Sequence, residues 1–513
     1  MTKIANWSNT HNVTGLLYQP ETLEELERLV RDCHERGMKL RPVGAGISPN
    51  GIAFEDQGMV NLSKMNNVLH VDEDTMQVRV QAGMRVSELV DALKPYGLTL
   101  PNYASIKEQE IGGFVSAGAH GTGAYIPPLD DTVVAMHLVT PARGGIEITR
   151  KEQPQLLDAL KVGLGAFGVV AEVTLQCVKS HNLEEHTFTA TRAQICANHE
   201  KWLKNNKHIR YMWLPYTDTV VVVTNNPTTK PPGVVGSELS DAEEERRLKP
   251  MHQLLTKGIN QCDPETRENL GLDASLVGSL NFAEARDWLL KFNTLNTEHV
   301  RRANQAEAEF WKNSEGKVVG DSSEMLQFDC GGEQLVFEVC YPTGTVDNLT
   351  PAIERKGRKV KPPSADVGFV MDLLEHIETT GFPAPSPIEQ RWTRASQSRM
   401  SPAASASIND VFSWVGVIMY LPVSDPTIRG RIQDKFRDYT QLVRKVGAEL
   451  PSDIYPHWGK IEMPSDAKAL EADQAWLSRR YPVGLFNSLR RELDPKNICA
   501  NDLINKAFPL DRE

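Results

Sequence analysis

The sequence predicts an α+β protein with two domains. Strand and helix patterns interleave from residue 20 to residue 178, and a second mixed segment follows after a break in composition. Three glycine-rich loops lie within the first segment, which predicts that its backbone comes close to a large ligand. A chain of 513 residues suits two or three domains of ordinary size.

The first segment opens with a well-marked helix. Thr22 and Glu25 have the spacing of a capping box, and Gly37 is the expected C-terminal stop. Apolar residues at helical spacing give this helix one buried face, made of Leu26, Leu29, Val30 and Cys33. Alternating patterns then predict strands at 68–71, 76–80, 133–139, 146–148 and 169–175, with a helix at 87–94 that ends at Pro95.

The second segment begins after Val178. Residues 225–250 are rich in Asn, Pro and Lys and then in Glu and Arg, and they predict a mobile insertion. Residues 343–368 predict a second such loop. Between them, 282–311 has a helical pattern with Leu289, Leu290, Phe292 and Leu295 buried. Strands return from Ile388 onward and include 413–421, and helices at 467–480 and 483–493 end the chain.

Composition excludes several classes of protein. The net charge of −11 argues against nucleic-acid binding. Seven scattered cysteines without a CxxC pair argue against a structural zinc site or a disulfide framework, and favour a reducing compartment. No apolar run is long enough for a transmembrane helix, and residues 1–12 lack the apolar core of a signal peptide.

The three glycine loops are residues 44–51, 111–123 and 163–168. The third has the GxGxxG spacing of a dinucleotide fingerprint, but an alternating strand follows it where that fingerprint requires a helix, so a Rossmann fold is rejected. The second holds five glycines in 13 residues together with His120 and Thr122. Glycine loops are usually turns, but three in one domain favour one large phosphate-bearing cofactor, and FAD has that size.

These loops are part of a wider resemblance. The order GAGIS at 44–48, IGGFVSAGAHGTG at 111–123 and GLGAFGVVAEVTL at 163–175 resembles the FAD domain of the vanillyl-alcohol-oxidase (PCMH-type) superfamily. Within it, residues 387–392, 456–460 and 491–495 resemble the aldonolactone oxidoreductases. Residues 102–106, 304–311 and 328–332 are similar to the plant dehydrogenases of that family.

The resemblance implies a domain plan. An FAD-binding domain is expected at 14–183, and a cap domain with a large antiparallel sheet flanked by helices at 184–450. The segment 451–513 is expected to return to the FAD domain. The resemblance also implies cofactor contacts, at Val43, Gly44, Ala45, Gly46, Ile47, Ser48, Gly112, Gly113, Gly118, His120, Gly121, Thr122, Gly123, Gly168, Val170 and Lys460.

Ile47 occupies the position where many relatives carry a histidine bonded to the flavin. An aliphatic side chain cannot form that bond, so we expect non-covalent FAD. The implied reaction is oxidation of the C2 hydroxyl of L-galactono-1,4-lactone, with hydride passing to flavin N5 and the 2-keto product enolising to L-ascorbate.

The implied catalytic residues are Glu389, Arg391 and Lys460. Glu389 and Arg391 stand at i and i+2, so on a strand both point to one face. Arg391 and Lys460 would stabilise negative charge on the reduced flavin, and Glu389 would either bind lactone hydroxyls or accept the proton. Ser105 is an expected substrate contact. Without the resemblance, such a pair would be an ordinary surface ion pair and Lys460 an exposed lysine.

Several other residues of the expected site allow more than one interpretation. Ala104 matches a position that guards oxygen access, which predicts a dehydrogenase that passes electrons to cytochrome c rather than to O2. Cys330 matches a redox-sensitive thiol, or is an inert buried cysteine. His457 is either a structural histidine or a base, and His120 bonds locally or reaches an FAD phosphate. Trp392 and Trp458 are expected to pack rather than to react.

Two rival functions stay open. One is an oxidase that uses O2 on gulono- or arabinono-lactone or on a polyol; the other is a flavoprotein that serves the assembly of a larger complex. The expected partners are the lactone and cytochrome c. A further hypothesis is peripheral association with a membrane or with a respiratory complex. We expect a soluble protein, mitochondrial if eukaryotic and otherwise cytoplasmic.

Overall fold

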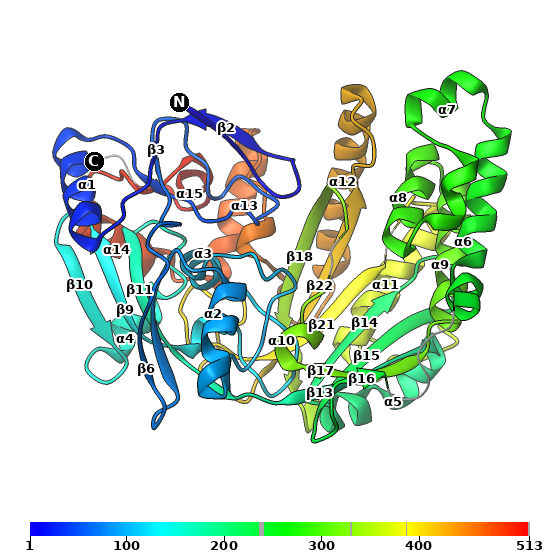
Figure 1. Ribbon diagram of the computed structural model, residues 1–513, viewed down its shortest axis with the longest axis horizontal. Helices are drawn as coiled ribbons and strands as arrows, with labels where there is room; N and C mark the ends of the chain where they lie inside the picture. The colour runs from blue at the N-terminus through cyan, green and yellow to red at the C-terminus, as the bar shows by residue number, and fades with distance from the viewer. Residues whose placement is uncertain (235–240, 329–330, 356, 386, 511–513) are drawn as a thin grey trace.

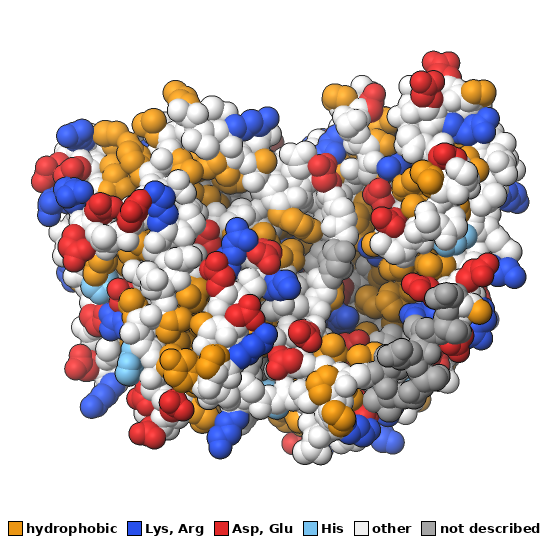
Figure 2. Space-filling view, viewed as in Figure 1, with side chains coloured by type: hydrophobic (Ala, Val, Ile, Leu, Met, Phe, Trp, Pro, Cys, Tyr) orange, Lys and Arg blue, Asp and Glu red, His pale blue; other side chains and the backbone are white. Residues whose placement is uncertain are grey.

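A computed structural model of the chain describes residues 1–234, 241–328, 331–355, 357–385 and 387–510. It has two halves, each built on its own sheet, and both chain termini lie on the N-terminal half (Figure 1). The face shown in Figure 2 is hollowed between the halves. None of the helices in the described ranges is long and apolar enough to cross a membrane.

The N-terminal half is organised around a five-stranded antiparallel sheet with the order β10-β9-β11-β7-β6. Every strand predicted there from alternation is confirmed, because the apolar positions face one buried core. The strands are β6 Val68–Asp72, β7 Gln77–Gln81, β9 Val133–Thr140, β10 Gly144–Thr149 and β11 Val169–Gln176.

Helix α1, Leu23–Arg36, confirms the first predicted helix. Thr22 accepts a hydrogen bond from the N–H of Glu25, and Gly37 closes the helix in the left-handed conformation. The Glu25 carboxylate accepts from the N–H of Glu21 rather than from Thr22, so the capping box is shifted by one residue. Beside α1 lies a small parallel sheet of β3 Leu17–Tyr18, β5 Met59–Val60 and β4 Arg41–Pro42.

Short elements connect these two sheets and precede them in the chain. An N-terminal hairpin packs beside the first glycine loop, and its strands are β1 Thr2–Ala5 and β2 Asn12–Gly15. The other elements of this half are α2 Val86–Leu93, the 3-10 turn Lys94–Tyr96, β8 Leu98–Thr99, α3 Ile111–Ser116, the 3-10 turn Leu129–Thr132, α4 Pro154–Leu160 and β12 Val178–Lys179.

The C-terminal half holds the large antiparallel sheet that the resemblance implied. Among the described residues its order is β16-β17-β13-β15-β14-β21-β22-β18-β23. The strands are β13 Asn182–Thr191, β14 His208–Trp213, β15 Thr219–Thr228, β16 Gly233–Val234, β17 Gly316–Asp321, β18 Gln334–Pro342, β21 Ile388–Arg394, β22 Val411–Tyr420 and β23 Tyr455–Pro456.

Helices cover both faces of this sheet. The back face, which carries Gln390 and Trp392, packs against α5 Arg192–Asn205, α11 Ala365–Thr380 and α12 Pro426–Gly447. The outer part of the front face packs against α9 Thr297–Lys312, which in turn contacts α6 Asp241–Gln261 and α8 Phe282–Asn293 (Figure 1). The rest of the front face meets the N-terminal half. Smaller elements are α7 Pro264–Leu270, the 3-10 turn Ala274–Ser279, α10 Ser322–Met325, β19 Gly344–Thr345 and β20 Asn348–Leu349.

Residues 225–250 are not the irregular insertion that their composition predicted. In the described part, β15 continues to Thr228, and the charged run after Asp241 opens the long helix α6. Leu248, Met251 and Leu255 of this helix are buried against its neighbours. Apolar burial at helical spacing thus outweighs the propensity of the charged residues and of Pro250. Residues 235–240 lie outside the described part.

The second expected insertion, 343–368, is largely irregular as predicted, apart from the short hairpin β19–β20 and the start of α11. It is anchored rather than loose, because Arg355 and Arg358 both bond the Asp372 carboxylate of α11. The single helical pattern at 282–311 is two helices, and Asn296 caps the second. Leu289 and Leu290 are buried as expected, whereas Phe292 and Leu295 are only half-buried.

The last segment returns to the N-terminal half after β23 has paired with β18. Its helices are α13 Ala467–Arg480, α14 Val483–Leu493 and α15 Asp502–Ala507, preceded by the 3-10 turn Trp458–Lys460. Phe486 packs on Phe167, and Ile498 and Cys499 join the core beneath α1. We therefore propose the division at 14–183, 184–450 and 451–513, whose boundaries stay a prediction.

Candidate functional site

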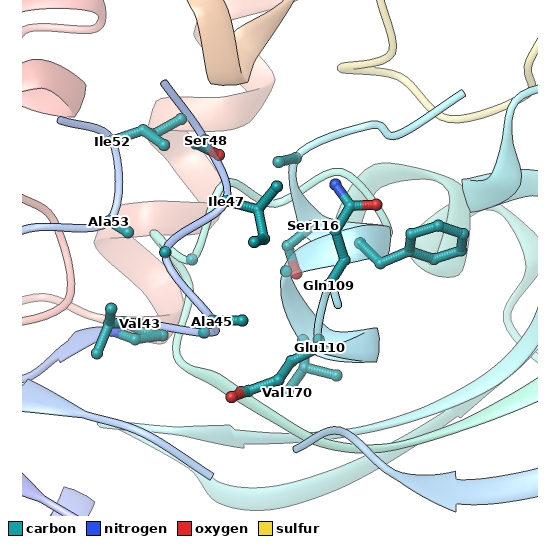
Figure 3. A pocket seen from close by; sticks show the side chains of 18 of the residues that line it. Val43, Ala45, Ile47, Ser48, Ile52, Ala53, Gln109, Glu110, Ser116 and Val170 are labelled. Atoms are coloured by element: carbon teal, nitrogen blue, oxygen red, sulfur yellow. The ribbon is translucent and has the colours of Figure 1, made fainter. Parts of the chain in front are cut away.

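The three glycine loops converge on one cavity of the N-terminal half, which we call the glycine-loop cavity (Figure 3). Ten of the predicted cofactor contacts line it: Val43, Gly44, Ala45, Gly46, Ile47, Ser48, Gly112, Gly113, Gly168 and Val170. Ile47 and Ser116 extend toward each other from opposite walls in the close-up. His457 lines the same cavity and comes from the segment that follows β23.

The first loop offers a row of backbone donors. Its carbonyls are engaged on the N-terminal hairpin, since Gly46 O accepts from Trp7 N at 2.7 Å and Ser48 O accepts from Asn6 Nδ2 at 3.0 Å. Within the described residues, the N–H groups of 44–48 have no hydrogen-bond partner in the chain. Consecutive unpaired N–H groups form a nest for anionic oxygens, so this loop fits a pyrophosphate.

Glycines in the other two loops keep the cavity open. A Cβ at Gly113 would meet no protein atom within 4 Å and would protrude into the cavity that this residue lines. Gly168 has φ +141°, and a Cβ there would lie 2.3 Å from the carbonyl oxygen of Val139. Since the three loops meet as the sequence predicted, their backbones can follow an extended phosphate-bearing ligand.

The second loop splits into two parts with different surroundings. Its first half is the short helix α3, whose Gly112 and Gly113 line the cavity. The structure does not place its second half, predicted as cofactor contacts at Gly118, His120, Gly121, Thr122 and Gly123, in the cavity wall. Gly123 N donates to Trp392 O at 2.6 Å and Thr122 Oγ1 donates to Ile209 O. This stretch therefore fastens β21 and β14 to the N-terminal half.

Glu110 is a buried carboxylate in the cavity wall that the sequence did not single out. It lies just before α3, and Asn61 Nδ2 donates to its Oε1 at 3.2 Å. Burial raises the pKa of Glu110 to about 7, although the Asn61 hydrogen bond opposes the rise. Glu110 therefore titrates near neutral pH beside the expected cofactor.

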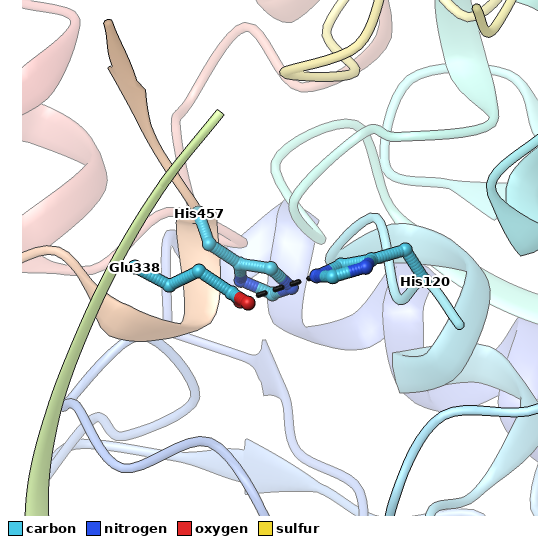
Figure 4. A group of neighbouring side chains, drawn as sticks. All are labelled: His120, Glu338 and His457. Atoms are coloured by element: carbon cyan, nitrogen blue, oxygen red, sulfur yellow. Dashed lines mark hydrogen bonds and ion pairs between the residues drawn. The ribbon is translucent and has the colours of Figure 1, made fainter. Parts of the chain in front are cut away.

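The catalytic residues predicted from the resemblance gather around a second carboxylate, Glu338 of β18. Arg391 Nη2 lies 2.8 Å from Glu338 Oε1, and Lys460 Nζ lies 2.5 Å from Oε2. His120 Nε2 is 3.1 Å from the same Oε2 (Figure 4), and its ring stacks on Trp414. The Glu338 side chain is 1% exposed, so these contacts replace its hydration.

Opposite charges are paired in this cluster. Burial alone would raise the pKa of Glu338, but Lys460, His120 and Arg391 outweigh it and hold the pKa well below its usual value. Burial lowers the pKa of His120 and, with Lys460 nearby, that of His457. Both ring nitrogens of His120 face acceptors, Glu338 Oε2 and Gly121 O, and a neutral ring can donate to only one of them; we assign the proton to Nε2, which faces the charged acceptor. Glu338 and Glu389 are thus acidic partners of the cluster's cations: Glu338 pairs with Arg391 and Lys460, and Glu389 lies near Arg391.

His120, Glu338 and His457 bring their ligand atoms within 4.8 Å of one another, close enough to hold a metal ion (Figure 4). A cation there would face Lys460 and Arg391, which already neutralise Glu338. The Nδ1 of His457 accepts from Gly459 N at 3.0 Å and is not available as a ligand. The group is therefore better described as a polar cluster than as a metal site.

Glu389 and Arg391 lie on the front face of β21, as their i, i+2 spacing predicted. Their Oε2 and Nη2 atoms are 3.5 Å apart, and Glu389 keeps 18% of its side chain exposed. Gln390 and Trp392 point to the back, where Trp392 Nε1 donates to Asp366 Oδ2 at 2.7 Å. Trp458 Nε1 donates to Met400 O at 2.6 Å. Both tryptophans thus pack in the interior, as expected.

Glu338 was missed from the sequence, although a signal exists. It is the one charged residue in the apolar run 335–341, which forms the buried strand β18. A carboxylate at a core position needs partners, but the sequence does not say which ones. Here the partners come from the second glycine loop, from β21 and from the turn after β23. In the strand register, Gly416 of β22 pairs with both Glu338 and Glu389 and so lies between them.

Ala104, Ser105 and Lys460, which were also predicted as site residues, do not line the cavity. Ala104 and Ser105 follow Tyr103; Ala104 packs on the main core, and Ser105 O accepts from Phe328 N at 3.1 Å. Cys330 lies outside the described residues. Lys460 does not line the cavity itself, but Asn50 of the first loop holds the carbonyls of Trp458 and Ile461 on either side of it.

Two family models match the chain. One describes an FAD binding domain and matches residues 15–150; the other describes D-arabinono-1,4-lactone oxidase and matches residues 173–507. The first covers two of the three glycine loops. The second includes Glu338, Glu389, Arg391 and Lys460.

Whole-chain similarities agree with these models. The mitochondrial L-galactono-1,4-lactone dehydrogenase of Brassica oleracea is 48% identical over 99% of this chain and 83% of its own length. The L-gulonolactone oxidase of Bos taurus is 26% identical over 99% of this chain and 98% of its own length. Cholesterol oxidase from B. sterolicum has a similar structure, with a TM-score of 0.72 and 16% identity over 99% of this chain and 96% of that one. The last likeness supports the predicted fold.

Proposed function

The chain belongs to the D-arabinono-1,4-lactone oxidase family of aldonolactone oxidoreductases, and on that premise we propose that it oxidises L-galactono-1,4-lactone at C2. Its cofactor is FAD, and the nest of the first loop and the open side of Gly113 fit the cofactor's phosphates. The 2-keto product enolises to L-ascorbate. The observation that carries the proposal is the cluster of paired charges, Glu338, Glu389, Arg391 and Lys460, next to the glycine-loop cavity.

The residues of the cluster divide the work of the reaction. FAD, when bound, supplies the acceptor for the hydride that leaves C2. The C2 hydroxyl must also lose its proton, and Glu389 is the partly exposed carboxylate that can accept it or hold the neighbouring hydroxyls. Arg391, on the same face, donates hydrogen bonds to lactone oxygens and stabilises negative charge as it develops.

Lys460 and Glu338 keep this arrangement fixed. A buried guanidinium and an ammonium would repel each other without a counter-charge, and Glu338 supplies it while leaving Arg391 oriented. The Lys460 ammonium can then stabilise the extra negative charge of the reduced cofactor. Its side chain is 20% exposed, so the cluster is partly shielded from water.

The experiment is anaerobic reduction of the bound flavin by L-galactono-1,4-lactone, followed by absorbance. The wild-type protein is expected to bleach. Glu389→Gln and Arg391→Ala are expected to keep FAD but to lose at least 100-fold in the rate of bleaching, in line with the loss of one acid–base or charge-stabilising group. Variants that bleach at the wild-type rate would refute the assigned roles.

Two finer points are part of the proposal. Because Ile47 has no nucleophilic atom, we expect FAD to be held without a covalent bond. Acid precipitation of the purified protein tests this, since the yellow colour should stay in the supernatant; colour in the pellet would contradict it.

We further propose that electrons pass to cytochrome c rather than to O2. The family position of Ala104 and the net charge of −11, which complements a basic partner, support this. Rapid reoxidation in air with release of peroxide would instead favour the oxidase alternative. The similarity to L-gulonolactone oxidase is the observation that supports that alternative. A dehydrogenase should react slowly with air, and Ala104→Gly should speed that reaction.

The names of the plant relatives suggest a mitochondrial setting, which we carry over as a proposal together with peripheral association with a respiratory complex. Fractionation of cells that express the full-length protein tests both. Recovery of the protein in the cytosol would exclude the mitochondrial setting.

A further inference from the structure

A second, smaller cavity lies on the front face of the large sheet, on the far side of Arg391 from Glu338. We call it the side cavity. Arg391 lines it together with Asn102, Tyr103, Arg210, Asn225 and Phe328. It shares no lining residue with the glycine-loop cavity, and the cluster of Arg391, Glu338 and His120 stands between the side cavity and His457 of the other. The two cavities thus flank the proposed reacting centre.

Arg210 of β14 is directly opposite Arg391 of β21 in the strand register. Like charges in that relation repel each other. Arg391 is neutralised by Glu338 and Glu389, but within the described residues Arg210 has no ion pair, and its buried Nε has no hydrogen-bond partner. The guanidinium lies 4.0 Å from the centre of the Phe328 ring, which orients it without satisfying its N–H groups.

Asn225 of β15 supplies the complementary group. Its side chain is 4% exposed, and its Nδ2 donates to Glu185 Oε2 at 3.3 Å. Because a carboxylate can only accept, this contact fixes the orientation of the amide and leaves Oδ1 as the free end. That oxygen is buried and has no partner among the described residues. A buried acceptor without a partner costs free energy that a ligand would recover.

We propose that Arg210 and Asn225 form a subsite for the exocyclic hydroxyl groups of the lactone substrate. This inference rests on the proposed function and adds the residues that select among aldonolactones. An unpaired donor and an unpaired acceptor on residues that line one cavity suit a hydroxyl, which both accepts and donates. A carboxylate ligand would suit Arg210 but would repel Asn225 Oδ1. The lactone ring then lies at Glu389 and Arg391, and the terminal hydroxyl of its side arm enters the side cavity, which has room for a group about the size of one water.

The test is stopped-flow reduction of the holoenzyme by L-galactono-1,4-lactone, which gives a dissociation constant and a limiting reduction rate. We compare wild type, Arg210→Met and Asn225→Leu. Losing a hydrogen bond to a charged group weakens binding about 10- to 100-fold, and losing one to the amide about 3- to 10-fold. We expect these increases in the dissociation constant, with the limiting rate within about threefold of wild type, because the ring contacts remain.

A matched control is Arg301→Met. Arg301 also lies over an aromatic ring, Tyr216 at 4.6 Å, and also has a buried unpartnered Nε, but it lines neither cavity. It should leave both constants unchanged. A pentono-1,4-lactone, whose side arm is one carbon shorter, is the second probe. The ratio of the two dissociation constants should shrink in both variants.

The inference is overturned if neither Arg210→Met nor Asn225→Leu changes the dissociation constant, or if the limiting rate falls while the dissociation constant stays the same. If Arg210→Met does not fold with FAD, Asn225→Leu alone decides, since it removes one buried acceptor and no charge. Failure of the proposed function is a separate result. In that case L-galactono-1,4-lactone would not reduce the wild-type flavin at any concentration.

Discussion

Removing the charge of Glu338 should damage the protein more than the loss of any surface ion pair. In Glu338→Gln the carboxylate becomes an amide of the same shape. The amide oxygen can still accept from one neighbour, but its NH2 group then faces Lys460 or Arg391, which also only donate. At least one of the contacts at 2.5 Å and 2.8 Å is lost, and Arg391 and Lys460 both lose the negative charge of Glu338.

The size of the effect follows from burial. Breaking a buried ion pair by neutralising one partner costs about 3–5 kcal/mol, because the other charge stays desolvated. An exposed pair of the same length is worth about 0–1 kcal/mol. The chain offers such a pair: Glu21 Oε1 lies 2.5 Å from Lys64 Nζ, with side chains 63% and 50% exposed. Glu21→Gln is therefore a matched control.

The assay is urea unfolding of the FAD-bound protein, followed by flavin and tryptophan fluorescence. We expect the urea midpoint of Glu338→Gln to fall below that of the wild type, and the midpoint of Glu21→Gln to fall much less. Lactone oxidation should also fall in Glu338→Gln, because Arg391 and Lys460 lose the carboxylate that holds them in place. A destabilisation below about 1 kcal/mol, equal to that of the control, would refute the view that Glu338 is the counter-charge of a buried cluster.

Three further predictions follow from single residues. Gly113→Val should fold but lose FAD, because the new side chain enters the cavity without touching the rest of the chain. The control is Gly484→Val, which is also helical and in open space but does not line the cavity, and which should keep FAD. Flavin content after gel filtration measures both variants, and equal contents would contradict the cavity assignment. The pKa of Glu110 is raised by burial to about 7, so its folded form holds a proton that the unfolded form has lost, and stability should decline as pH rises from about 4.3 through 7, by on the order of 3 kcal/mol. Glu110→Gln should remove that decline in melting temperature between pH 5 and pH 8, and an unchanged slope would exclude Glu110 as its source. Burial raises the pKa of Asp366, but the charge of His199 and the hydrogen bonds to the carboxylate bring it down to about 2. The stabilising contribution of Asp366 is therefore present above about pH 4 and is lost as the pH falls toward 2. Asp366→Asn should weaken the loss of folded protein at acid pH, followed by circular dichroism, and an unchanged acid unfolding curve would show that other carboxylates cause the loss.

Much of the fold could be predicted from the sequence, because local patterns and tertiary burial agree there. The strands of the N-terminal sheet alternate apolar and polar residues, and α1 has both a capping threonine and a closing glycine. The helices at 467–480 and 483–493 have the same bounds in the structure as in the prediction. The front-face placement of Glu389 and Arg391 also followed from the two-residue period of a strand.

The errors arose where long-range contacts decide. Residues 241–250 are charged and include Pro250, yet they belong to a helix because its later residues are buried against α8 and α9. The glycine loop 111–123 looks uniform in the sequence, whereas in the structure Gly112 and Gly113 line the cavity and Gly118 and residues 120–123 do not. Arg210 and Asn225 have no local signature of function, and the apolar run around Glu338 marks it without naming its partners. Their roles depend on which strands become neighbours, and the order of strands in a sheet is not encoded in any short window.

The second half of loop 2 links the two kinds of residue. Gly121 packs so closely on Asn102 that a Cβ would lie 2.2 Å from Asn102 Oδ1, and Asn102 in turn donates to Thr122 O. Thr122 and Gly123 bond the backbones of β14 and β21, the strands that carry Arg210 and Arg391. The glycines here serve close packing between the halves, and so set the distance from the glycine-loop cavity to the substrate residues. A substitution such as Gly121→Ala should therefore slow lactone oxidation while the phosphate nest of the first loop, which it does not touch, still binds FAD.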